Sequence, residues 1–216
     1  MSDSNNPKRT CCDCGTQACA AEPGTAKHPS FCLQTANPEV LATARKAYTD
    51  PATRAVAAAA ARTEASGYCR DTRIEEIIAF ARRLGVTHLG IACCIGLKRE
   101  ARAAAEIFRA AGFEVTSVIC KAGGMPKEEL GLEDAEKIRP GGFEASCNPV
   151  GQAALLDSAG CGLNVLVGLC VGHDSLFFKH SKAPVTVLVA KDRVTGHNPA
   201  AVLYNSESYY RRLREG

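Results

Sequence analysis

The chain has 216 residues, of which 12 are cysteine, two are methionine and none is tryptophan. This cysteine content lies below the roughly 8–10% that is typical of short disulfide-stabilised secreted proteins, and a chain of this length can bury a core without disulfides. The 26 basic and 23 acidic residues give a net charge of +3, which is too balanced to indicate binding to nucleic acid or to an anionic membrane. The composition therefore predicts one globular domain, alone or with an appendage, whose cysteines need another explanation.

The first ten residues, MSDSNNPKRT, are polar and lack the apolar segment of a secretory signal. No stretch of the sequence approaches the ~20 consecutive apolar residues that a membrane helix needs. We therefore expect a cytoplasmic protein without membrane or nucleic-acid partners. Because thiols stay reduced in the cytoplasm, clustered cysteines there more often bind metal or carry out chemistry than form disulfides.

Composition divides the chain into three segments. Residues 1–36 are polar and rich in cysteine, residues 37–84 are rich in alanine, and residues 85–216 alternate short β-branched runs with helical stretches. We expect these to be a cysteine-rich metal-binding segment, a helical region that packs on the sheet domain, and an α/β domain.

The middle segment carries clear helix-start signals. An Asn-Pro pair and an Asp-Pro pair each place a capping residue before a proline at the first helical position, which predicts helices over about 38–48 and 51–66. Thr72 and Glu75 have the spacing of a capping box and open a third helix, which Gly85 closes. These local signals predict three successive helices before the first strand.

Four short, β-branched runs follow, and we predict that they are strands: Val86–Ala92, Phe113–Ile119, Leu163–Leu169 and Val185–Ala190. Helices are expected between them at 97–111, 149–159 and about 175–180, and a short helix near 133–138. Alternating strands and helices predict a parallel sheet in a Rossmann-like or flavodoxin-like three-layer α/β fold of about four strands. The long, Gly-rich connection over 120–147 is typical of a functional loop.

Five cysteines fall where predicted strands end or shortly before a helix begins: Cys93, Cys94, Cys120, Cys147 and Cys170. In an open parallel sheet these positions share one edge, which is where ligands bind. Four thiolates there suit an iron–sulfur cluster, of the [4Fe–4S] kind, or a tetrahedral Zn²⁺. The alternative is that each is a small buried apolar residue. Cys161 lies at the opposite edge, where we expect a structural role, and Cys69 receives no assignment.

A second group of thiols lies in the N-terminal segment: Cys11, Cys12, Cys14, Cys19 and Cys32. The segment is too short and polar to form a hydrophobic core, so metal ligation is the physical reason for it to fold. The spacing matches neither the bacterial ferredoxin run nor a zinc finger, which leaves the metal open. A disordered reducing tail is the alternative, and His28 is either a further ligand or a bystander.

Polar residues follow the same strand ends as the cysteines. The candidate catalytic residues are His173, Asp174 and Lys121, and the candidate substrate-binding residues are Lys191, Arg193 and His197. Together they predict an electropositive rim that binds an anionic substrate or offsets the negative charge of a thiolate-ligated cluster. Solvated surface lysines are the alternative. No GxGxxG, GxxxxGK[ST] or GxSxG motif supports nucleotide binding or a serine nucleophile.

These residues are compatible with three functions. The first is an iron–sulfur protein with one or two clusters, acting in electron transfer or in chemistry on a small anionic or sulfur-containing substrate, with a redox partner. The second is a non-enzymatic zinc or metal-handling module. The third is a persulfide or sulfur-transfer protein in which Cys93 or Cys94 is the nucleophile. The sequence leaves open whether the protein is an enzyme and how many copies assemble.

Five blocks of the chain resemble a family of bacterial and archaeal cysteine-rich proteins of unknown function, to which metal binding is attributed. The blocks are IACCIGLKREA, VICKAGG, CNPVGQAALL, NVLVGLCVGHDSLFFKHSKAPVTVLVAKDR and GHNPAAVLY. The resemblance extends over nearly the whole chain, and it implies metal binding through cysteines without implying a reaction. By this resemblance the family's motif blocks contain Cys94, Cys120, Cys147, Cys170, His173 and Asp174.

Overall fold

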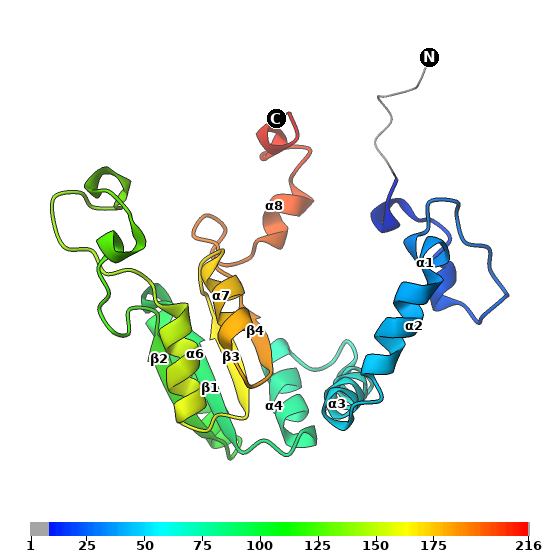
Figure 1. The fold of residues 1–216 in the computed structure, drawn as a ribbon, viewed down its shortest axis with the longest axis horizontal. Coiled ribbons are helices and arrows are strands. Elements are labelled where there is room, and N and C mark those ends of the chain that lie inside the picture. The colour runs from blue at the N-terminus through cyan, green and yellow to red at the C-terminus, as the bar shows by residue number, and fades with distance from the viewer. Residues whose placement is uncertain (1–8, 216) are drawn as a thin grey trace. The chain divides into compact units, whose positions relative to one another are not determined.

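The computed structural model describes residues 9–215, and two compact units divide the chain between Ala58 and Ala59 (Figure 1). This boundary lies within helix α3, which runs over Pro51–Gly67. The three segments expected from composition, with limits at 36 and 84, stay a prediction. None of the described helices is long and apolar enough to cross a lipid bilayer.

The N-terminal unit consists of short elements with almost no core. It contains the 3₁₀ turns η1 (Cys11–Asp13) and η2 (Ala18–Ala20), then α1 (Leu33–Ala36), α2 (Pro38–Ala47) and the start of α3. Only Ala18 and Cys32 are buried among residues 9–58. The Asp50 carboxylate accepts a hydrogen bond from the Thr53 backbone N–H at 2.7 Å, which caps α3 as the sequence predicts.

The second unit is built on a four-stranded, all-parallel sheet. Its strands are β1 (His88–Cys93), β2 (Glu114–Ile119), β3 (Leu163–Val167) and β4 (Val185–Val189), in the order β2-β1-β3-β4. Cys93 pairs with the last residue of β2 on one side and the last residue of β3 on the other, so these three strands end level. The predicted α/β fold with flavodoxin-like topology is confirmed.

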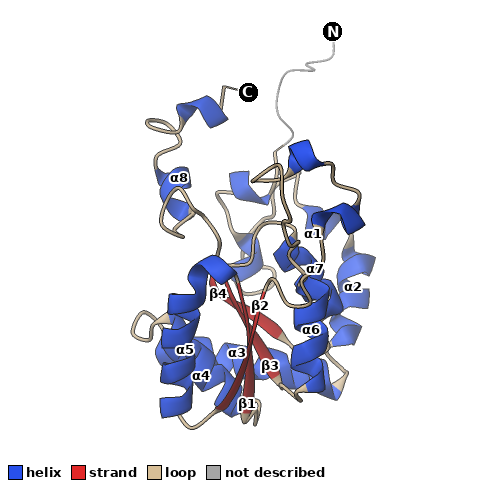
Figure 2. Ribbon diagram, turned by 90° about the vertical axis from the view of Figure 1, so that its left-hand side faces the viewer, coloured by secondary structure: helices blue, strands red, loops and turns tan. Residues whose placement is uncertain are grey.

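Helices cover both faces of this sheet (Figure 2). One face carries α4 (Arg73–Arg83) and α5 (Lys98–Ala110), and the other carries α6 (Pro149–Ser158) and α7 (His173–His180). The chain moves along the sheet in one direction from β1 to β2 and in the other from β2 to β3, so right-handed crossovers place α5 and α6 on opposite faces. The largest fully buried side chains include Phe108 and Phe177, one from each helical layer.

Several predicted bounds differ from the structure by a few residues, and two helices show the physical reasons. Helix α7 begins at His173 rather than near 175, because the Cys170 carbonyl accepts hydrogen bonds from the backbone N–H groups of His173 and Asp174. The short helix expected near 133–138 is a single 3₁₀ turn, Asp134–Glu136. After β4 the chain forms one further short helix, α8 (Ala200–Tyr204).

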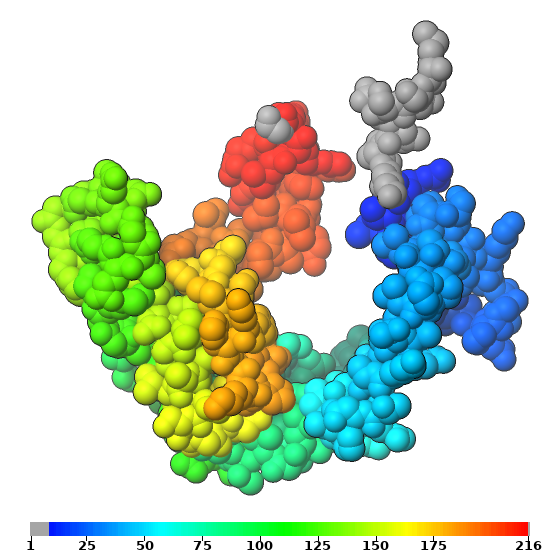
Figure 3. All heavy atoms as spheres, viewed as in Figure 1, coloured from blue at the N-terminus to red at the C-terminus, as the bar shows by residue number. Residues whose placement is uncertain are grey.

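Residues 126–145 form a separate lobe beyond the end of β2, seen in green at the upper left of Figure 3. The lobe is held largely by ion pairs. The Lys137 side chain is only 4% exposed, and its ammonium contacts the carboxylates of Glu128 and Asp134 and the Gly142 carbonyl. A bridge between Pro126 and Ala145 closes the base of the lobe. The long connection over 120–147, which the sequence marks as a functional loop, therefore folds into this lobe.

Candidate functional site

Backbone hydrogen bonds bring three cysteine-bearing segments together at the carboxyl edge of the sheet. The Cys94 N–H donates to the Val167 carbonyl at 3.1 Å, and the Cys120 N–H donates to the Cys93 carbonyl at 2.9 Å. The Asn148 N–H, just after Cys147, donates to the Cys120 carbonyl at 2.7 Å. These bonds fix the ends of β1 and β2 and the start of α6 against one another.

Cys94, Cys120 and Cys147 lie close enough for hydrogen bonding with Cys120 to act on the pKa of both other thiols, and we call these three residues the thiol trio. Cys120 is the middle member and also accepts a hydrogen bond from the Ile95 backbone N–H at 3.4 Å. Cys94 and Cys120 are buried, while Cys147 is half-buried. The first and last members of the trio, Cys94 and Cys147, lie 53 residues apart in the sequence.

Hydrogen bonding within the trio divides its protons unequally. The bond to Cys120 is the largest influence that lowers the pKa of Cys94, to about 4, with help from the Gly96 N–H and the Lys191 charge. The bond to Cys120 likewise lowers the pKa of Cys147 to about 5, assisted by the charges of Lys121 and His173. Cys120 donates to two thiolates, so its own pKa is raised. Deprotonation is therefore favoured at Cys94 and Cys147 and disfavoured at Cys120.

Cations surround these thiolates. The Lys191 Nζ lies 3.4 Å from the Cys94 sulfur, and an Arg193 Nη lies 3.2 Å from the Cys170 sulfur. The pKa of Arg193 is raised, chiefly by its hydrogen bond to Cys170 and then by the charges of the thiols around it. The structure thus brings Lys121, Lys191 and Arg193 together at the sheet edge.

The two adjacent cysteines at the end of β1 have different environments. The Cys93 thiol is 2% exposed and points to the Val118 carbonyl at 3.8 Å, because successive residues of a strand face opposite sides. Burial raises the pKa of Cys93, and the neighbouring charge of Cys94 raises it further. The structure therefore places Cys94 in the trio and Cys93 behind it.

Two predicted site residues have local structural partners instead. The Asp174 carboxylate accepts a hydrogen bond from the Ser175 backbone N–H in the first turn of α7. His197 has a positive φ of 70° and its Nδ1 accepts from the Asp192 N–H at 3.1 Å, which shapes the turn after β4. The charge of His173 acts on the pKa of Cys147, and the buried His173 Nδ1 has no hydrogen-bond partner among the described residues.

Gln152 is a residue that the sequence pattern did not single out. It lies on α6, is fully buried, and its side-chain amide donates to the Cys93 carbonyl at 3.2 Å and the Val118 carbonyl at 2.7 Å. These bonds brace the strand ends that carry Cys94 and Cys120. A lone glutamine in the apolar stretch CNPVGQAALL is the signal that could have found it.

The N-terminal cysteines surround a cavity of about 640 Å³ within their own unit. All five predicted ligands line it, together with His28: Cys11, Cys12, Cys14, Cys19 and Cys32. The His28 Nδ1 lies 3.6 Å from the Cys32 sulfur. A hydrogen bond from the Thr16 side chain lowers the pKa of Cys14, and one from the Thr35 backbone lowers that of Cys32. The five cysteines that the sequence predicts as ligands therefore line the same cavity.

Comparison with known proteins now identifies the family. A family profile described as "Protein of unknown function (DUF1847)" matches residues 32–188. The chain belongs to the DUF1847 family. It is similar to "Uncharacterized protein MJ0455" of Methanocaldococcus jannaschii, with 46% identity over 137 residues, which cover 63% of this chain and 68% of the relative. No solved structure matches the chain. The resemblance to a family of unknown function is confirmed, and the matched range contains the trio, Cys170 and Cys32.

The opposite edge of the sheet in this DUF1847 protein carries a different thiol. The Cys161 sulfur lies 3.7 Å from the His88 Nε2, which is also 2.9 Å from the Thr116 hydroxyl. Burial raises the pKa of Cys161, and the negative charge of Glu114 raises it further. Cys161 is therefore a protonated, buried thiol. Cys69 is exposed and has a positive φ of 52° just after α3.

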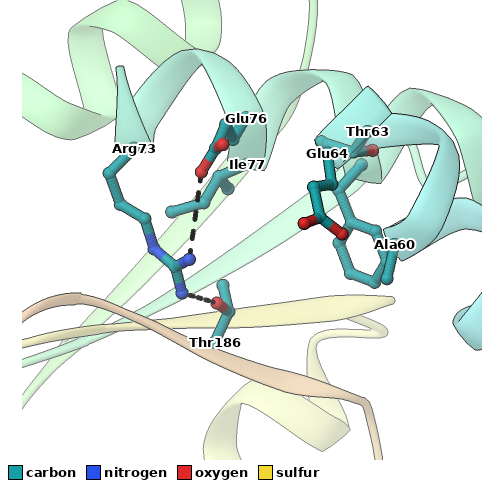
Figure 4. Close-up of a pocket in the computed structure, with 8 residues that line it drawn as sticks. Ala60, Thr63, Glu64, Arg73, Glu76, Ile77 and Thr186 are labelled. Carbon is teal, nitrogen blue, oxygen red and sulfur yellow. Dashed lines mark hydrogen bonds and ion pairs between the residues drawn. The ribbon is translucent and has the colours of Figure 1, made fainter. Parts of the chain in front are cut away.

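A second cavity of this DUF1847 protein, of about 330 Å³, lies among α3, α4 and β4 (Figure 4). The Arg73 guanidinium crosses it and donates to the Thr186 hydroxyl at 2.9 Å and the Val187 carbonyl at 3.1 Å. Since β4 is an edge strand, Arg73 satisfies a carbonyl that would otherwise be open to another strand. These contacts of Arg73 cover part of the sheet edge.

The sheet edge fits a thiophilic metal in its chemistry. All twelve cysteines are free thiols, and the trio supplies three soft sulfur donors beside several cations. Gly96 leaves room there, since a Cβ at this position would lie 3.4 Å from the Lys191 Nζ and 3.8 Å from the Cys94 sulfur. As the side chains stand, no three His, Cys, Asp or Glu residues within 9–215 meet closely enough to hold an ion. The sulfurs are placed as hydrogen-bonded thiols.

Proposed function

We propose that this DUF1847 protein holds a metal centre at the carboxyl edge of its sheet, an iron–sulfur cluster of the [4Fe–4S] kind, through Cys94, Cys120 and Cys147. The observation that carries the proposal is the thiol trio itself. Packing alone does not require three cysteines from three separate parts of the chain to gather at one edge of the sheet, with the pKa of two of them lowered. Thiolates clustered in cationic surroundings are what such a cluster needs.

When bound, the cluster supplies one-electron transfer or a Lewis-acidic iron. The surrounding side chains would compensate charge, attract substrate and exchange protons. Lys121, Lys191 and Arg193 offset the negative charge of thiolate ligands and attract an anionic substrate. His173 offers an unpartnered Nδ1 that can accept or donate a proton at the Cys147 side of the site. These features support electron transfer or chemistry on a small anionic substrate.

The N-terminal cysteines are proposed as a second metal site, with His28 as a further candidate donor. Support comes from the cavity that all five cysteines line and from the near absence of a core in residues 9–58. Ligation energy replaces hydrophobic burial in such segments. The lowered pKa values of Cys14 and Cys32 favour the deprotonated form that a metal requires.

Zinc and sulfur transfer are the competing functions at the sheet edge. Zinc is favoured by the same sulfur donors and would leave the protein colourless. Sulfur transfer rests on Cys94, whose sulfur lies 3.4 Å from the Lys191 ammonium. Cys93 is less suited as a nucleophile because its thiol is buried against the Val118 carbonyl.

Anaerobic purification followed by measurement of iron, zinc and acid-labile sulfide tests the proposal. We expect absorbance near 400 nm and about four iron and four sulfide per cluster. Cys94→Ser and Cys147→Ser should each remove most of one cluster's iron. Cys161→Ser is the matched control, because it changes a buried thiol at the opposite edge and should keep all the iron.

Each outcome of these measurements decides between the candidates. Iron with sulfide that is lost in Cys94→Ser supports the cluster, and bound zinc without sulfide supports the zinc module instead. A protein that takes up neither metal, with Cys94 the thiol that alkylating reagents modify fastest, favours sulfur transfer. Circular dichroism of every variant shows whether iron loss reflects loss of a ligand or loss of the fold.

A further inference from the structure

Cys170 stands apart from the thiol trio. The trio is joined by hydrogen bonds through Cys120, whereas the Cys170 sulfur accepts a hydrogen bond from the Arg193 guanidinium at 3.2 Å. Cys170 follows β3 and Arg193 follows β4, so their contact joins two neighbouring strand ends. Cys170, the fourth cysteine of the predicted ligand set, is thus hydrogen-bonded to an arginine that follows the neighbouring strand.

Two cations face the trio from the end of β4. Lys191 contacts the Cys94 sulfur at 3.4 Å. Arg193 contacts the Cys170 sulfur at 3.2 Å, and the charges of Cys94 and Cys147 act on its guanidinium more weakly. Positive charge therefore borders the trio on the side where Cys170 lies. This arrangement suits a small anion better than a fourth anionic protein ligand.

A buried polar atom of the residue that begins α7, three positions after Cys170, lacks a partner. The His173 Nδ1 is inaccessible to solvent, has no hydrogen bond among the described residues, and belongs to a ring near Cys147. An unpaired buried nitrogen costs stability, and native proteins rarely keep one without a function. Gly96 adds space beside Cys94, because it places no side chain there. Both features point to a ligand supplied from solution.

We propose that Arg193 and Lys191 form, with Cys170, a binding site for a small anion with a sulfur donor atom, and that Cys170 is not a ligand of the metal centre. The inference rests on the proposed metal centre. A site with three protein ligands keeps one position open, as catalytic rather than structural metal sites do. The contact between Cys170 and Arg193 shows that a sulfur atom fits against this guanidinium.

Metal content of two variants tests the ligand set. Cys170→Ser should keep the iron, or zinc, of the wild-type protein, whereas Cys94→Ser should lose most of the metal of the sheet-edge site. Equal losses in the two variants would make Cys170 the fourth ligand and overturn the inference. Far-ultraviolet circular dichroism accompanies both measurements, so that an unfolded variant is replaced by Cys170→Ala and Cys94→Ala.

Anaerobic titration calorimetry with sodium hydrosulfide tests the anion site on the metal-loaded protein. We expect saturable binding that Arg193→Gln weakens by about tenfold, which is the usual effect of losing one charge-assisted hydrogen bond. Arg99→Gln is the control, since Arg99 is an exposed cation on α5 that contacts no thiol in the described structure. Sodium chloride at the same ionic strength should give no binding.

The outcomes separate the two proposals. Metal-loaded protein that binds no hydrosulfide, or binds it equally well after Arg193→Gln, overturns the anion site and leaves the metal centre standing. Protein that holds neither iron nor zinc overturns both. Hydrosulfide binding that needs the metal and is weakened only by Arg193→Gln establishes the inference.

Discussion

The two edges of the sheet carry the same kinds of side chain but give them opposite electrostatic surroundings. At the carboxyl edge, hydrogen bonding to Cys120 and nearby cations hold the pKa of Cys147 at about 5. At the amino edge, burial and the charge of Glu114 raise the pKa of Cys161. Each thiol has a histidine near it. The comparison teaches that a thiol's neighbours, more than its presence in a cluster of cysteines, decide whether it is ionised.

The topology explains the difference. In a parallel α/β sheet, helix N-termini and their positive dipole ends gather at the carboxyl edge, and helix C-termini gather at the amino edge. Here α6 begins two residues after Cys147, and the chain adds Lys191 and Arg193 beyond β4. The amino edge receives a carboxylate instead, since β2 begins with Glu114.

Alkylation gives the largest expected contrast between the edges. In metal-free, reduced protein at pH 6, Cys147 should react with iodoacetamide about a hundredfold faster than Cys161. Cys147 is mostly thiolate at that pH, and a thiol with an ordinary or raised pKa is ionised well below 1%. Peptide mass spectrometry measures both rates. Similar rates in the folded protein would contradict the comparison, while similar rates in urea are the expected control.

Acid should release the lobe at the carboxyl edge before the sheet unfolds. Lys137 lowers the pKa values of Glu128 and Asp134, so their ion pairs stabilise the lobe above the unfolded carboxyl pKa of about 4 and are lost as pH falls. The raised pKa of Lys137 means that its contribution is lost only at strongly alkaline pH. Stability of the lobe is therefore expected to hold between about pH 5 and pH 10.

A tryptophan can report this transition. The chain has none, and Phe143 is an exposed aromatic residue on the lobe, so Phe143→Trp supplies a local fluorescence signal. Its emission should change between about pH 5 and pH 2, at higher pH than the far-ultraviolet circular dichroism of the sheet. Lys137→Met removes the ion pairs and should abolish the separate transition. Coincident fluorescence and dichroism changes would show that the lobe and sheet unfold together.

Two glycines give the smallest expected contrast. A Cβ on Gly162, at the amino edge, would lie 3.2 Å from both Cγ atoms of Val86, so Gly162→Ala should lower the free energy of unfolding by about 1 kcal/mol. The nearest atom for Gly96→Ala is the flexible end of Lys191, and stability should change by only a few tenths of a kcal/mol. Urea unfolding measures both, and equal losses would contradict this difference in packing.

Much of the fold could be predicted because its signals are local. The starts of α3 and α4 follow from capping residues, and the four strands follow from short β-branched runs. Helix α2 begins at Pro38 as predicted, but Asn37 does not cap it, because its side-chain amide donates to the Leu33 carbonyl. Helix α7 was predicted to begin too late, since its first turn is fixed by the Cys170 carbonyl, a contact that periodicity does not encode. The lobe was expected only as a loop, because its order depends on ion pairs around Lys137.

By itself the sequence determined the α/β topology and the placement of thiols after the strands, because residue pattern and strand direction fix which edge a strand-end residue reaches. Only the tertiary structure decided that Cys94 joins Cys120 and Cys147 while Cys93 turns away and Cys170 pairs with Arg193. The physical reason is that these pairings depend on strand register and on side-chain directions at the level of single residues. Hydrogen bonds between distant segments set both.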